Sequence, residues 1–153
     1  MRFSIAATAA LLLTGNATLA SEFERVPPVT HAATLKQCGE CHMAYQPGLL
    51  PAASWTRIMD GLADHFGDKA SLPPDVAADI RGYLTRNAGG GDGRLVRITD
   101  QRWWQRKHGF ESTVWQRKTV GAKGNCEACH RTAAKGLYED DWALLQTFAV
   151  GAR

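Results

Sequence analysis

The sequence predicts an all-α protein, mainly helical with much irregular loop, that forms two small domains. Two segments, 54–67 and 73–84, carry apolar side chains at the 3.6-residue spacing of an amphipathic helix. No segment shows the residue-by-residue alternation of a half-buried strand. The glycines within residues 89–93 disfavour both helix and strand, so this run is typical of a flexible linker between two parts of the chain.

Residues 1–20 have the pattern of a secretory signal peptide. Arg2 gives a positive start, Ile5 to Leu13 form a short apolar run, and Thr18-Leu19-Ala20 offers small residues at a cleavage point. The alternative is an uncleaved membrane anchor, but the apolar run is about half of the ~20 residues that a spanning helix needs. The sequence therefore predicts an exported chain that is cleaved near Ala20/Ser21.

The rest of the chain is predicted to form an N-terminal domain over 21–88, a glycine-rich linker over 89–97 and a C-terminal domain over 98–153. The formal net charge is +3, and Lys and Arg are scattered, so no nucleic-acid-binding surface is indicated. Domains of roughly 60 residues have thin cores and need a staple such as a metal or a cofactor.

The four cysteines occur in two copies of one motif, Cys-x-x-Cys-His, at residues 38–42 and 126–130. This motif is the signature of covalent haem c attachment. Its two thiols add to the two vinyl groups on one side of a porphyrin, and the next residue presents an imidazole to the iron. The sequence thus predicts two covalently bound haems c. The attachment residues are Cys38, Cys41, Cys126 and Cys129, and the proximal ligands are His42 and His130.

Three other uses of paired cysteines fit less well. A zinc site built from two Cys-x-x-Cys knuckles would need far fewer than the 84 residues that separate them. A redox-active dithiol would normally occur once and needs no trailing histidine. Two local disulfides would leave the repeated histidine unexplained, although disulfides are common in exported proteins.

The expected helices follow from capping residues and apolar stripes. One helix should run from about Thr30 through the first motif, and a turn at 47–51 should end it. Ser54 can cap the next helix, and Gly67 is placed to end it.

Pro73-Pro74 should open a third helix. After the linker, Thr99 can cap a short helix that runs from Asp100 to His108. The tail after Thr132 shows little periodicity, and its structure is left open.

The sixth iron ligand decides the chemistry of each haem, since it sets the reduction potential and the access of small molecules. For the first haem, His65 is favoured and Met59 remains a rival on the same helix face. Met43 adjoins the proximal histidine and cannot reach the opposite side. For the second haem, His108 has no competing methionine in its half. His31 is left over and is expected at the surface.

The sequence also suggests residues that contact the haems or orient their ligands. The carbonyl of Pro47 or Pro51 is a plausible acceptor for the second ring nitrogen of His42. Four tryptophans are expected to pack on the haems, namely Trp55, Trp103, Trp104 and Trp115. Four cations are expected near haem propionates, namely Arg57, Arg102, Arg106 and Lys107.

Three runs of sequence resemble the small periplasmic dihaem cytochromes c of proteobacteria. They are residues 38–67, residues 97–108, which include Arg97-Ile98-Thr99 and Arg106-Lys107-His108, and residues 125–130. The resemblance covers roughly residues 27–134. It implies a periplasmic protein whose N-terminal domain is similar to class I cytochromes c, with an irregular C-terminal haem domain and bis-histidine irons. It also implies two redox partners, a soluble oxygen-binding monohaem cytochrome c and a membrane cytochrome b.

Three functions compete. The first is electron transfer by two saturated haems. The second is a dihaem peroxidase-like enzyme, which needs one iron that opens and acid or base groups above it. Glu139, Asp140 and Asp141 form the acidic cluster of the sequence, and a solvated turn explains them better. The third is a haem-based sensor, which also needs an open iron.

Overall fold

The computed structural model describes residues 25–138, so the predicted signal peptide and the acidic cluster at 139–141 lie outside the described range. Within this range the chain forms helices, turns and loops without a strand, which confirms the predicted all-α class. Two isolated bridges occur, between Arg25 and Leu137 and between His65 and Asp68. No helix in the described range is long and apolar enough to cross a membrane.

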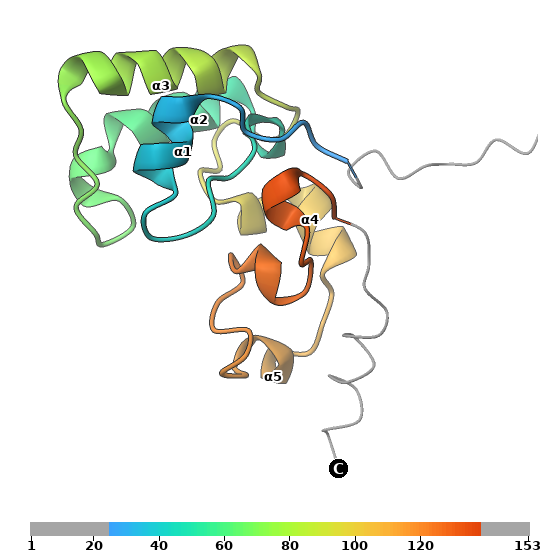
Figure 1. Ribbon diagram of the computed structural model, residues 1–153. Helices are drawn as coiled ribbons and strands as arrows, with labels where there is room; N and C mark the ends of the chain where they lie inside the picture. The colour runs from blue at the N-terminus through green and yellow to red at the C-terminus, as the bar shows by residue number, and fades with distance from the viewer. Residues whose placement is uncertain (1–24, 139–153) are drawn as a thin grey trace, which may run out of the picture.

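Helices α1 (Ala32–Cys38), α2 (Ala52–Asp60) and α3 (Pro74–Arg86) pack together as the upper part of the molecule in Figure 1. Two 3-10 helices, η1 (Pro47–Leu49) and η2 (Leu62–Asp64), flank α2. The apolar stripes of α2 and α3 meet in one buried cluster. Its members are Leu50, Trp55, Met59, Ile80 and Leu84.

The second half of the described chain is more irregular. Helices η3 (Ile98–Asp100), α4 (Arg102–Lys107) and α5 (Ser112–Trp115) are short, and η4 (Cys126–Ala128) and η5 (Ala133–Lys135) are single 3-10 turns. The buried apolar side chains of this half are few, namely Trp104, Val120 and Ala133. So little core is the reason that a cofactor is expected to support this part of the fold.

Several predicted helix boundaries are wrong. The first helix ends at Cys38 instead of running through the motif, because Gly39 follows. The second begins after Pro51, and the Ser54 hydroxyl donates to the carbonyl oxygen of Leu95 at 2.6 Å instead of capping the helix. That helix also ends at Asp60, ahead of Gly61, well before Gly67.

The third helix agrees better with its prediction. It starts at Pro74, directly after Pro73, and Ile80 and Leu84 of its stripe are buried. Beyond the glycines, the expected single helix is two elements. Thr99 lies inside η3, and Gln101, an extended and buried residue, precedes α4 instead.

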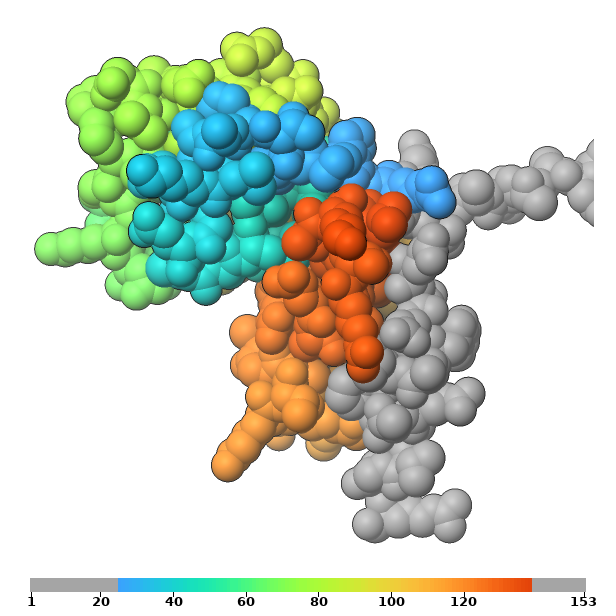
Figure 2. All heavy atoms as spheres, viewed as in Figure 1, coloured from blue at the N-terminus to red at the C-terminus, as the bar shows by residue number. Residues whose placement is uncertain are grey.

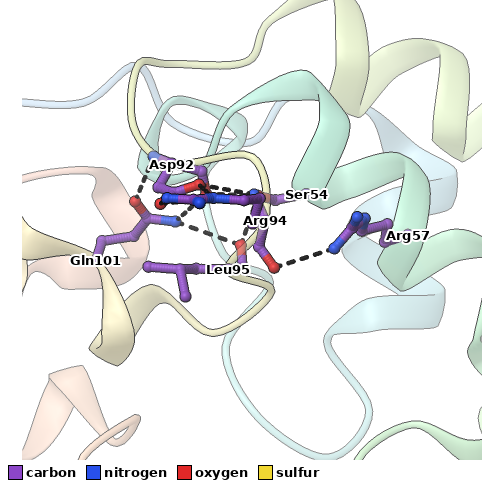
Figure 3. A network of polar contacts seen from close by, with 6 residues as sticks. All are labelled: Ser54, Arg57, Asp92, Arg94, Leu95 and Gln101. Carbon is purple, nitrogen blue, oxygen red and sulfur yellow. Dashed lines mark hydrogen bonds and ion pairs between the residues drawn. The ribbon is translucent and has the colours of Figure 1, made fainter.

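The glycine-rich segment forms hydrogen bonds with residues that precede it and with residues that follow it in the sequence. Gly89 donates to the carbonyl oxygen of Leu50 at 2.9 Å. The buried amide of Gln101 accepts from the Asp92 backbone N–H at 2.9 Å and donates back to the Asp92 carbonyl at 3.0 Å (Figure 3). The contact of Ser54 with Leu95 ties the same loop to α2. The domain boundary at 89–97 stays a prediction, but the segment itself is anchored rather than free.

The beginning and the end of the described chain lie side by side, as Figure 2 shows for the blue and red segments. Val26 donates its backbone N–H to the carbonyl oxygen of Gly136 at 2.8 Å. Gly136 has φ +74°, and a Cβ built on it would lie 1.8 Å from the Val26 carbonyl oxygen. Only glycine fits this position, because a side chain would meet both the backbone clash and the left-handed strain.

We therefore expect Gly136→Ala to lower the free energy of unfolding by at least about 2 kcal/mol, of which about 1–2 kcal/mol comes from the left-handed backbone. Denaturant unfolding of the haem-loaded protein measures the loss. Gly90→Ala is the matched control, because no atom lies within 4 Å of its built Cβ. Equal stability of the two variants would contradict this close approach.

Candidate haem-binding sites

The first motif lies at the end of α1. Cys38 is the last helical residue, while Cys41 and His42 follow in an exposed turn. His42 Nδ1 lies 2.7 Å from the carbonyl oxygen of Met43, which leaves the other ring nitrogen available to a metal.

The predicted proline acceptors for His42 are wrong. The carbonyl oxygen of Pro47 accepts the indole N–H of Trp55 at 2.7 Å. The carbonyl oxygen of Pro51 accepts backbone N–H groups at the start of α2. These bonds fix the loop between α1 and α2, and with it the turn that carries the motif.

His65 faces the proximal histidine of the first motif. The ring centroids of His42 and His65 are 6.4 Å apart, and their planes differ by 27°. An imidazole nitrogen binds a metal at ~2.0–2.1 Å, so two rings on opposite sides of one metal have centroids roughly 6 Å apart. The pair is therefore spaced as two axial ligands of one iron would be.

His65 is held by a tight turn rather than by the helix that the sequence predicts. Its N–H donates to the carbonyl oxygen of Asp68 at 2.7 Å, and the Asp68 N–H donates back at 3.2 Å. Phe66 completes the turn with φ +60°, which is uncommon for a non-glycine residue. Burial, with His42 nearby, lowers the pKa of His65, and this favours the neutral imidazole that binds metals.

Met59, the rival ligand, belongs to the buried core. Its side chain is 6% exposed and packs in the cluster with Leu50, Trp55 and Ile80, although it also borders the cavity described next. Its packing is accounted for without a metal.

A cavity of about 670 Å³ opens between the two histidines of the first site. This volume lies within the range of ~300–1,000 Å³ of cofactor pockets. Cys38, Cys41, His42 and His65 all border it, together with apolar side chains of α2 and α3. The cavity is also lined by residues 96 and 97 of the predicted linker and by residues 98, 99 and 122–124 of the second half, so both halves of the chain build the first site.

The second motif forms η4 and the turn after it. The ring centroids of His108 and His130 are 6.0 Å apart, and their planes differ by 80°. This spacing again fits two imidazoles on opposite sides of one metal. The ring planes are nearly perpendicular here, whereas they are closer to parallel at the first site.

His108 is oriented by Trp104, one helical turn earlier. His108 Nδ1 lies 2.9 Å from the carbonyl oxygen of Trp104. The indole and imidazole rings stack at 4.3 Å with an angle of 6°. Trp115 packs against both rings. Two of the four predicted tryptophans, Trp55 and Trp104, also border the cavity of the first site.

The four cysteines are unpaired thiols in this structure. Burial raises the pKa of Cys38 and Cys129, and it raises that of Cys126 to about 11. Over residues 25–138 no three His, Cys, Asp or Glu side chains gather as a metal-binding group.

Sequence reasoning missed two residues at the first site. Tyr45 stacks on His42 with centroids 4.7 Å apart, and burial raises its pKa to about 12. Arg97 lies 4.1 Å over the ring of Phe66 and borders the cavity, which none of the four predicted propionate partners does. Arg57, one of those four, donates instead to the carbonyl oxygen of Arg94 at 3.1 Å.

The fold and the sites define the class of protein. A strand-free helical chain over the described range carries two Cys-x-x-Cys-His motifs, each facing a second imidazole across the space of one metal. That combination is the hallmark of a c-type cytochrome with two haems.

Comparisons with known proteins support the same class of protein. The profile of the dihaem cytochrome c family matches residues 34–138. The chain belongs to this family, and it carries two covalently bound haems c. It is thus an electron-transfer cytochrome. No curated protein matches the chain.

Solved structures of dihaem cytochromes share the fold. A dihaem cytochrome from Rhodobacter sphaeroides is 39% identical, with a TM-score of 0.66 over 72% of this chain and 98% of that one. A second structure from the same organism is 36% identical, with a TM-score of 0.66 over 73% and 99%. A dihaem cytochrome from Shewanella baltica is 40% identical, with a TM-score of 0.64 over 71% and 86%.

Proposed function

We propose that this chain is a periplasmic electron carrier with two bis-histidine haems and no catalytic site of its own. The supporting observation is the spacing of two histidine pairs, 6.4 Å and 6.0 Å between ring centroids. In each pair one member belongs to a Cys-x-x-Cys-His motif. The other comes from a separate turn, Asp64–Asp68 for the first pair and the end of α4 for the second.

In this proposal the cysteines of each motif attach one haem, which supplies an iron that takes up and releases one electron. His42 and His65 bind the first iron, and His130 and His108 bind the second. Fixed imidazoles on both sides leave no position for a substrate and limit the rearrangement between oxidation states. The Trp104 carbonyl and the Met43 carbonyl hold the outer ring nitrogens of one ligand at each site.

The proposed partners are a membrane cytochrome b as donor and a soluble, oxygen-binding monohaem cytochrome c as acceptor. Both would meet the protein in the periplasm, the destination of the predicted signal peptide.

The two parts of the described chain differ in charge. Residues 25–97 carry eight Lys and Arg against seven Asp and Glu, whereas residues 98–138 carry eight against three. Within the described range, the second half therefore has the larger excess of positive side chains, and we propose that it attracts an acidic partner.

The proposal is tested by the spectrum of protein produced in a host that matures c-type haem. We expect two haems per chain, low-spin ferric bands, no sulfur-to-iron charge-transfer band and no binding of carbon monoxide. A high-spin signal, or rapid reaction with peroxide, would instead support the peroxidase-like enzyme. A spectral change with a small ligand would support the sensor.

Charge attraction makes a separate prediction about partners. The reaction rate with an acidic redox protein should fall several-fold between low and physiological ionic strength, because salt screens charges over ~8–10 Å. Stopped-flow mixing at several salt concentrations measures this. The replacement of Lys118 and Lys123, both exposed, by glutamine should reduce the salt dependence. The same change at Lys36 and Lys69 of the first half is the control, and equal effects would contradict docking on the second half.

A further inference from the structure

Tyr45 contacts the first motif and the loop that leads into the second motif. Its ring stacks on the ring of His42 with centroids 4.7 Å apart and an angle of 27°. Its hydroxyl donates to the carbonyl oxygen of Gly124 at 2.7 Å. Gly124 lies two residues before Cys126, so one side chain contacts the proximal histidine of the first site and the attachment loop of the second.

The next residue makes a parallel connection. The side-chain amide of Gln46 is fully buried and donates to the carbonyl oxygen of Ala133 at 2.7 Å. Its oxygen accepts the hydroxyl of Tyr138, and the Tyr138 ring packs edge-on against His130 at 5.6 Å. The segment that follows the first motif is thus bonded to both sides of the second motif.

The loop that Tyr45 holds has little support of its own. Backbone hydrogen bonds within residues 122–130 are short-range turns, for example from Cys126 to Gly124 and from His130 to Cys126. No apolar side chain between Gly121 and His130 is fully buried. The bond from Tyr45 is therefore a long-range anchor of a loop that also lines the cavity of the first site.

We propose that Tyr45 is a positioning residue that joins the two haem sites into one unit. Its ring fixes the plane of His42, and its hydroxyl fixes the loop that carries the second pair of cysteines. The two roles reside in different parts of one side chain, so different substitutions separate them. This proposal rests on the haem ligation proposed above.

The test uses the haem-loaded protein with Tyr45→Phe and Tyr45→Leu. Phenylalanine keeps the ring and removes the hydroxyl, so amide exchange over residues 124–130 should become about tenfold faster while the ferric electron paramagnetic resonance signals stay unchanged. Leucine removes the ring as well, so the signal of the first haem should also shift, because that signal depends on the angle between the two ligand planes. The signal of the second haem should stay in place.

Tyr83→Phe is the matched control. Tyr83 also stacks on a histidine, His31, with centroids 4.8 Å apart, and its hydroxyl accepts the N–H of Thr30 at 3.2 Å. Neither contact involves a motif, so this variant should change neither measurement.

Two results would overturn the proposal. One is unchanged exchange over 124–130 in Tyr45→Phe, or an increase spread evenly over the chain. The other is an unchanged first signal in Tyr45→Leu. Wrong haem ligation is distinguishable from both, because it would already be visible in the spectrum of the unaltered protein.

Discussion

Replacement of both Cys126 and Cys129 by serine is expected to halve the haem content and to unfold the second half of the described chain. Without the thiols, the second haem loses its covalent attachment. Residues 98–138 bury only three apolar side chains, Trp104, Val120 and Ala133. A segment of about 40 residues with so little core does not fold without a disulfide, a metal or a cofactor to stabilise it. A cofactor that binds only the folded form supplies that stability.

Mass and absorbance measure the haem content, and hydrogen exchange by segment measures the unfolding. Exchange should approach the unfolded rate over residues 102–130 and stay slow in α2 and α3. The matched variant replaces Cys38 and Cys41. It should lose one haem too, but α2 and α3 should keep much of their protection, because the buried members of the cluster around Trp55 and Ile80 are not motif residues, although Cys38 packs against the cluster.

Slow exchange over residues 102–130 in the serine variant would contradict this account. It would mean that the hydrogen bonds from Tyr45 and Gln46 hold the second half without its haem. Support by the haem and support by these hydrogen bonds can be distinguished. If the bonds hold the segment, Tyr45→Phe added to the serine variant should speed its amide exchange.

The candidate haem sites could be predicted from the sequence because their chemistry is local. Each Cys-x-x-Cys-His motif holds three of the groups that bind one haem within five residues. The sequence favoured His65 over Met59 as the partner of His42 because histidine is the commoner metal ligand, and His108 had no competing methionine in its half. The ring centroids of these pairs lie 6.4 Å and 6.0 Å apart, and the pairing itself stays a prediction. The backbone around His65 differs from the predicted helix. His65 lies in a turn after η2, because α2 ends ahead of Gly61, six residues before the predicted Gly67.

The contacts between the two halves were not predictable from the sequence. Tyr45 and Gly124 are 79 residues apart, and nothing in a pattern of nearby residues indicates such a bond. Glycines at 89–93 suggested freedom, yet the buried amide of Gln101 and the hydroxyl of Ser54 bind this loop. A polar residue that looks like a helix cap in sequence can serve a distant carbonyl instead, and only the folded chain decides between the two.

Replacement of either proposed distal histidine by alanine should open one iron. Without His65 or His108 the sixth position has no ligand at imidazole distance, so about half of the haem should become high-spin. Carbon monoxide should then bind at one site per chain, whereas the unaltered protein should bind none. Optical titration with the gas measures the stoichiometry, and each variant should lose a different one of the two low-spin ferric signals, since the ligand planes differ by 27° at one site and 80° at the other.

His31→Ala and Met59→Leu separate ligation from packing. His31 pairs with Asp79 at 3.2 Å and stacks on Tyr83, so its loss should leave both haem spectra unchanged. Met59→Leu keeps the volume of the core and should cost less than about 1.5 kcal/mol of stability, without a spectral change. If Met59→Leu instead produced the high-spin signal and His65→Ala did not, Met59 would be the ligand. His65 would then only line the cavity, although its ring lies at the distance from His42 that two ligands of one metal would have.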